Sequence, residues 1–197
     1  ELQKEQDIDT MLQRIEQAKM ELTSMGYAIT EDAMVSACNN GIVQAVRAFL
    51  RTGFSPDTVD SAGVPVLNLA ARGQHHDVMW VLLKHGADVN LPGADRKTTA
   101  LMEAAVRGDE AGVNMLIQYG ADLELKSSSG QSALMMAVGE GNTNIATQLL
   151  DNGAGIQTVD ALGMTAYKYA NLFNQKDLVA YMDSIFGADE PLPDENV

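Results

Sequence analysis

The chain of 197 residues carries a formal net charge of −14 and a single cysteine, and 46% of its residues are hydrophobic. The negative charge disfavours nucleic acid and anionic membrane surfaces as partners, because like charges repel. One cysteine excludes an intrachain disulfide, and the longest apolar run, residues 78–83, is too short to cross a bilayer.

The pattern in residues 1–26 predicts an amphipathic helix that ends near Gly26. Apolar side chains recur at steps of three and four residues, and charged or amide side chains fill the gaps. The apolar positions are Ile8, Met11, Leu12, Ile15, Ala18, Leu22 and Met25. We expect this helix to cap the open end of the segment that follows; coiled-coil pairing and binding to a second protein are the alternatives.

A fixed period frames the rest of the chain and predicts an array of structural repeats. The framing glycines recur every 33 or 34 residues: Gly53, Gly86, Gly120 and Gly153. In the clearest unit, the pattern predicts a short helix over residues 66–72 and a second helix over residues 77–85. Gly86 is expected to end the second helix by adopting a left-handed conformation. A Thr or Ser precedes the first helix of the later units, where its hydroxyl can cap free backbone amides.

The phrases Leu67-Asn68-Leu69-Ala70-Ala71-Arg72-Gly73-Gln74-His75 and Val81-Leu82-Leu83-Lys84-His85-Gly86-Ala87-Asp88-Val89-Asn90 resemble the ankyrin-repeat family. The resemblance implies an all-α ankyrin-repeat solenoid, with a helix-turn-helix and a hairpin loop in each repeat and an N-terminal capping helix. The expected array spans 27–186, as repeats 27–59, 60–93, 94–126, 127–159 and 160–186. Residues 187–197, rich in acids and proline, are expected to form a flexible tail.

Two departures from the family pattern fall within this array. The usual His of the first helix is replaced by Asn68, Met102, Met135 and Lys168. Lys97 stands where a hairpin Gly is usual, so we expect that hairpin to bend differently.

The sequence contains no arrangement of residues that is typical of a catalytic site. His75 matches a position where ankyrin proteins use the ring to bind backbone, and Cys38 matches a buried alanine position. No cysteine and histidine spacing indicates zinc, and the glycines end helices rather than cradle phosphate. We therefore expect no enzyme activity, no metal and no cofactor.

The resemblance places a partner on the concave side, which hairpin tips and first helices form. A basic centre and an apolar group near the C-terminal end stand out there. Packing of Leu172 and Phe173 under the C-terminal cap is the alternative. The predicted partner-binding residues are Arg72, Asp95, Arg96, Lys97, Val106, Arg107, Ser129, Gln131, Glu140, Leu162, Met164, Leu172 and Phe173.

These features predict a non-catalytic, monomeric protein-binding module. With no second domain to recruit, we expect an inhibitor or immunity-type protein that covers a partner with a basic surface or an enzyme cleft, as some bacterial ankyrin proteins do with cell-wall enzymes. A scaffold that joins two proteins is the alternative, and an enzyme or metal protein is a remote one. The bacterial periplasm, after removal of a leader, and the cytoplasm both fit.

Overall fold

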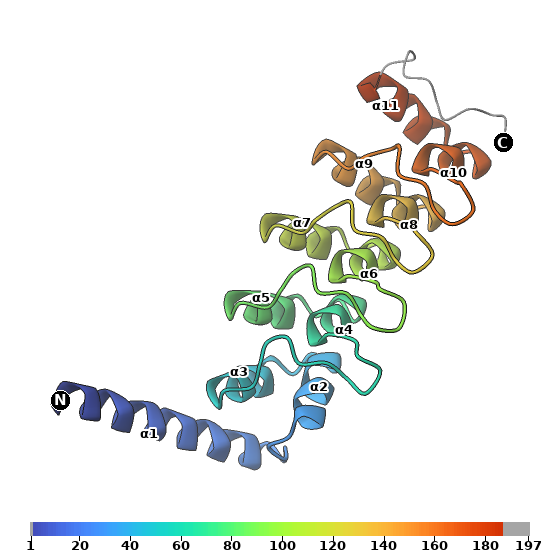
Figure 1. Cartoon of the computed structure of the whole chain (residues 1–197). Coiled ribbons are helices and arrows are strands. Elements are labelled where there is room, and N and C mark those ends of the chain that lie inside the picture. Colours follow the sequence, from blue (N-terminus) through green and yellow to red (C-terminus); the bar gives the residue numbers. More distant parts are fainter. Residues whose placement is uncertain (1, 187–197) are drawn as a thin grey trace. The chain divides into compact units, whose positions relative to one another are not determined.

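A computed structural model describes residues 2–186, and the expected acidic tail at 187–197 lies outside the described residues. Within 2–186 the chain is helical, and an isolated antiparallel bridge joins Val59 to Pro65. The chain divides into two compact units, residues 1–95 and 96–197. Each unit is built from helix pairs joined by hairpin loops (Figure 1), so the predicted all-α repeat architecture is confirmed.

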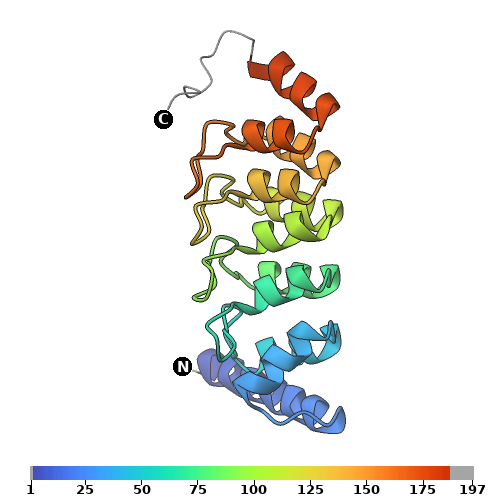
Figure 2. The same cartoon turned by 90° about the vertical axis from the view of Figure 1, so that its right-hand side faces the viewer.

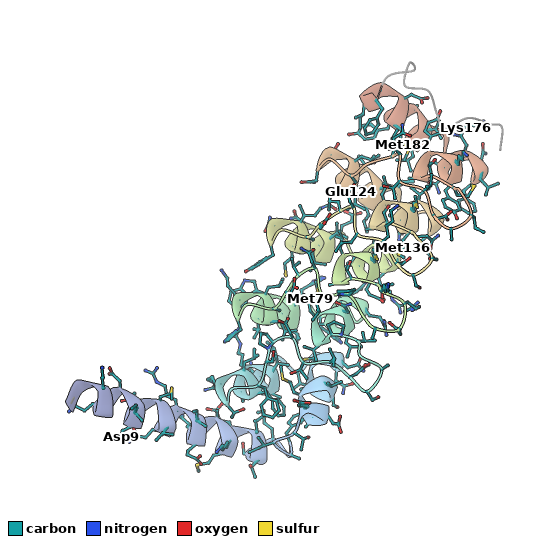
Figure 3. All side chains as sticks on the ribbon, viewed as in Figure 1. Asp9, Met79, Glu124, Met136, Lys176 and Met182 are labelled. Carbon is teal, nitrogen blue, oxygen red and sulfur yellow. The ribbon has the colours of Figure 1, made fainter. Side chains whose placement is uncertain are left out.

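Unit 1, residues 1–95, holds one long helix and two helix pairs. The helices are α1 (Leu2–Ser24), α2 (Glu31–Asn39), α3 (Val43–Arg51), α4 (Val66–Arg72) and α5 (His76–Lys84). Within each pair the first helix packs on the second, and successive pairs pack α4 on α2 and α5 on α3. This stacking buries small side chains such as Ala70 and Ala71 together with large ones such as Met79, which is labelled in Figure 3.

The helix α1 packs on the repeats only through its C-terminal half. Ala18 and Leu22 are buried where α1 meets α3, and Glu21 forms an ion pair with Arg51. The N-terminal half extends beyond α3, on the side where the second helices of the pairs lie (Figure 1). Ile8, one of the apolar positions that predicted an amphipathic helix, is 53% exposed in this N-terminal half.

Unit 2, residues 96–197, holds three helix pairs. The helices are α6 (Ala100–Arg107), α7 (Glu110–Gln118), α8 (Ala133–Gly139), α9 (Thr143–Asp151), α10 (Ala166–Leu172) and α11 (Lys176–Phe186). Its core is again small and aliphatic, and Met182, labelled in Figure 3, is fully buried on α11. In each unit the hairpin loops project to one side of the helices (Figure 2).

Local chemistry sets where these helices begin and end. Thr99 and Ser132 accept hydrogen bonds from backbone amides of the first turn, at 3.4 Å in each case, and Thr165 does the same at 3.1 Å. Gly120 ends α7 with a φ of 85°, a conformation that side chains resist, while the next amide returns to Leu116 O at 3.0 Å. The expected caps and the glycine stop therefore both occur.

Side chains also join neighbouring hairpins within unit 2. Glu124, labelled in Figure 3, accepts hydrogen bonds from Gly155 N at 2.7 Å and from Thr158 Oγ1 at 3.0 Å. On the hairpin tips the links are made by backbone: Ser128 N donates to Arg96 O at 2.8 Å, and Ala161 N donates to Ser129 O at 3.0 Å. The tips are therefore held in a fixed series beside the first helices.

Candidate binding groove

A groove of about 370 Å³ lies in unit 2, along the first helices of its three pairs. The helices α6, α8 and α10 form one wall, and hairpin residues form the other. Its lining combines apolar, aromatic and charged side chains: Arg96, Thr98, Met102, Glu103, Val106, Gln131, Met135, Met136, Gly139, Glu140, Tyr169 and Phe173.

Methionines form the floor of the groove. Met102 and Met135 are almost fully buried, and both stand where the family resemblance places His. Met136, labelled on α8 in Figure 3, is half-buried. Thioether side chains are unbranched and polarizable, so they adapt to different apolar groups. The floor can therefore accept an apolar side chain without a rigid shape requirement.

A buried carboxylate, Glu103, anchors the charged rim. Glu103 is 5% exposed, and its Oε1 accepts a hydrogen bond from Thr98 Oγ1 at 2.9 Å. The guanidinium of Arg96 approaches the same oxygen at 3.5 Å, while 61% of the Arg96 side chain stays exposed. Glu103 therefore ties the hairpin to α6 and orients a cation that still faces solvent.

Two aromatic rings close the other end of the groove. Tyr169 and Phe173 stack with their centroids 6.0 Å apart and their planes 7° apart. The Tyr169 hydroxyl donates to Asp160 Oδ2 at 2.6 Å, and this hydrogen bond is the main cause of the raised pKa of Tyr169. Phe173 remains 48% exposed, so the stack presents an accessible apolar surface.

Asp160 holds the hairpin next to these rings. Its Oδ1 accepts hydrogen bonds from the amides of Leu162 at 2.8 Å and Met164 at 2.9 Å. Burial acts to raise the pKa of Asp160, but the hydrogen bonds from Tyr169 and the two amides outweigh it and hold the pKa below its ordinary value. Leu162 itself is 82% exposed at the tip.

The structure brings some of the predicted site residues together and leaves others apart. Those that line the groove are Arg96, Val106, Gln131, Glu140 and Phe173. Those elsewhere on the surface of unit 2 are Lys97, Arg107, Ser129, Leu162, Met164 and Leu172. Arg72 and Asp95 belong to unit 1 and are not part of this groove.

Several groove residues were missed by the sequence analysis: Met102, Met135, Met136, Glu103 and Tyr169, together with Asp160 behind the ring of Tyr169. One signal was available for Asp160. It precedes Gly163 by the same spacing that separates Asp60 from Gly63, and Asp60 Oδ1 likewise accepts two hairpin amides, at 2.9 Å each.

Cys38 and His75, the residues considered above for catalysis or metal binding, have contacts that fit a role in the fold. Cys38 is fully buried, and burial raises the pKa of its thiol to about 12. The Nε2 atom of His75 lies 2.9 Å from Asn39 O, a contact between side chain and backbone. Within residues 2–186 no cluster of three His, Cys, Asp or Glu side chains is arranged to hold a metal ion. In the same span, no helix has the length and apolar character that crossing a membrane requires.

Comparison with known proteins gives one family and several relatives. The family described as "Ankyrin repeats (3 copies)" matches residues 15–93, 33–127 and 101–189. A putative ankyrin repeat-containing protein of Treponema pallidum (strain Nichols) is 37% identical over 161 residues, which are 82% of this chain and 54% of that protein. Ankyrin repeat and SAM domain-containing protein 6 of Danio rerio is 31% identical over 156 residues, 68% of this chain and 21% of that protein.

A more distant relative carries the name of an enzyme. L-asparaginase of Dirofilaria immitis is 24% identical over 194 residues, which are 82% of this chain and 33% of that protein. The chain thus spans about half, or less, of the length of the curated relatives it matches.

Proposed function

The chain belongs to the ankyrin-repeat family, whose repeats generally act as non-catalytic protein-interaction modules, and on that premise we propose that it binds a protein partner in the groove of unit 2. The observation that carries the proposal is Phe173, a half-exposed aromatic ring stacked on Tyr169 beside a methionine floor. Exposed aromatic side chains next to apolar pockets are frequent anchors of protein interfaces.

The groove favours a partner segment that combines an apolar side chain with flanking polar groups. The apolar side chain would enter between Phe173 and the methionines, where it leaves water. Arg96 and Glu140, two exposed charged residues of the lining, would pair with groups of opposite charge and fix the register of the segment. Lys97 and Arg107, both exposed, would extend the cationic part of this contact.

Within this role we propose that the chain inhibits its partner by covering it, as an immunity-type protein does. The similarity to a bacterial protein of Treponema supports a first search among bacterial enzymes, including those of the cell wall. A partner enzyme should lose activity when the chain is added. A partner that keeps full activity while bound would favour the scaffold alternative and refute inhibition.

The experiment is a capture of partners from native lysate, with quantitative mass spectrometry and four baits: the unmodified chain and three variants. Phe173→Ala should weaken capture of the specific partner about thirtyfold, as the loss of about 2 kcal/mol at an interface anchor would. Arg96→Glu combined with Arg107→Glu should abolish capture while helical content stays unchanged. Its melting temperature should fall, because the variant places a second carboxylate beside the buried Glu103.

Lys176→Glu, an exposed charge reversal outside the groove, is the matched control and should capture the partner as the unmodified chain does. Retention of the partner by both groove variants would refute the placement of the interface, whatever the partner turns out to be.

A further inference from the structure

The second helices of unit 1 carry a half-exposed tryptophan between two cations. Trp80 on α5 is 42% exposed, and it is the single tryptophan of the chain. The guanidinium carbon of Arg47 on α3 lies 5.6 Å from the centroid of the ring, and Lys84 Nζ lies 5.9 Å from it. Both distances are within the range of cation–π attraction, so the ring helps to hold the two cations on this face.

Arg47 also lines a hollow of about 510 Å³. The C-terminal end of α1, the exposed side of α3 and the end of α5 form its walls: Glu21, Ser24, Met25, Gln44, Arg47, Arg51 and His85. Met25 is 39% exposed and supplies an apolar surface there. The hollow thus offers space for a side chain next to Arg47.

The charge of this face is opposite to that of the chain. The whole sequence has 13 Lys and Arg against 27 Asp and Glu, yet three of the cations, Arg47, Arg51 and Lys84, gather on α3 and α5. Two carboxylates lie close by. Glu21 is engaged by Arg51, and Asp77 lies one turn before Trp80 on α5. The face formed by Arg47, Arg51, Trp80 and Lys84, hereafter the Trp80 surface, therefore combines an apolar ring with an excess of positive charge.

We propose that the Trp80 surface binds an acidic segment of a partner protein. Carboxylates of the segment pair with Arg47 and Lys84, one apolar side chain of the segment packs on the ring, and a second enters the hollow against Met25. Tryptophan and arginine are the residue types most enriched among interface anchors, and the cationic cluster selects acidic sequences. The surface belongs to unit 1 and uses no residue of the groove, so the chain would have two separate places to hold proteins.

The single tryptophan gives a direct test, because its fluorescence reports on this surface and on no other. A short synthetic peptide that repeats two glutamates and one leucine is titrated into the full chain while the emission of Trp80 is recorded. We expect a saturable shift of the emission to shorter wavelength, since the peptide removes water from the ring. Added salt should weaken the apparent affinity, because the attraction is between exposed charges.

Charge-reversal variants that keep Trp80 complete the test. Arg47→Glu combined with Lys84→Glu should reduce the affinity at least tenfold, and the milder Arg47→Gln with Lys84→Gln should reduce it less, with circular dichroism unchanged. Lys126→Glu with Lys176→Glu makes the same change of net charge in unit 2, at exposed positions, and should leave the affinity as it was.

Three results would overturn the proposal: no shift with the acidic peptide, an equal shift with a peptide in which lysine replaces glutamate, or equal affinity in the charge-reversal variant. A shift that depends on protein concentration without peptide would show that a second copy occupies the surface, and would also overturn it.

Discussion

Replacing Lys97 by glycine should stabilise the protein, although it removes a charged side chain from a predicted binding surface. Lys97 adopts a φ of 53°, in the left-handed region that favours glycine. Glycine stands at the corresponding place of the other hairpins, with φ of 75° at Gly63, 79° at Gly130 and 71° at Gly163. The hairpin that the departure from the family pattern singled out thus takes the same left-handed conformation with a lysine.

The expected gain follows from two opposing contributions. A residue with a side chain in the left-handed region costs about 1–2 kcal/mol relative to its preferred conformation. Replacing lysine by glycine also costs about 0.4–1 kcal/mol of stability, because glycine loses more backbone freedom on folding. This cost offsets part of the relieved strain. Lys97→Gly should therefore raise the free energy of unfolding by about 0.5–1 kcal/mol, which in a chain of this size raises Tm by about 1–4 °C.

Urea and thermal denaturation followed by circular dichroism measure this gain, and two variants isolate its cause. Lys97→Ala removes the charge but keeps a side chain in the left-handed region, so it should bring little stabilisation. Gly163→Lys makes the reciprocal change where a Cβ meets nothing within 4 Å, so it should destabilise by a similar amount. If Lys97→Gly is no more stable than Lys97→Ala, the conformational strain assigned to Lys97 is refuted.

Two further predictions concern titrating groups. Tyr169→Phe removes a hydrogen bond that helps to hold the pKa of Asp160 below its ordinary value, so this pKa should rise. The stability that the ionised carboxylate provides should then be lost at a higher pH on acidification, and an unchanged NMR titration of the Leu162 and Met164 amides would contradict this. Cys38, whose thiol pKa burial raises to about 12, should react with a thiol reagent far more slowly in the folded chain than in urea, and equal rates would show that the thiol is accessible.

Local signals made most helices predictable from the sequence. The helix predicted at 66–72 is α4, and the one predicted at 77–85 is α5 shifted by one residue, because His85 leaves helical geometry at the end. Capping hydroxyls and glycine stops act within one turn of a helix, so a single sequence reveals them. The packing of α1 on the repeats was harder to predict. Its periodicity predicts an apolar face, but which part of that face meets α3 depends on the length of the helix it packs against.

The groove was predictable only in outline. The family resemblance, carried onto the repeats of this chain, placed Arg96, Gln131 and Phe173 on hairpin tips and at the ends of first helices, and these residues line the groove. The buried Glu103 and the pair of Asp160 and Tyr169 depend on contacts between a hairpin and the helix after it. Such contacts depend on how the chain folds back on itself, which neither composition nor spacing specifies. The sequence thus indicated some of the residues that line the groove, but not the buried Glu103 or the Asp160–Tyr169 pair that hold them in place.

The backbone links between hairpin tips bear on how such a chain can change during evolution. Ser128 N and Ala161 N donate to carbonyl groups of the preceding hairpins, so side-chain identity at the tips plays no part in these bonds. Every amino acid except proline has the required amide. Substitutions at Ser129 or Leu162 therefore change the surface that the tips present while these backbone hydrogen bonds persist, and selection for a new surface need not oppose selection for folding.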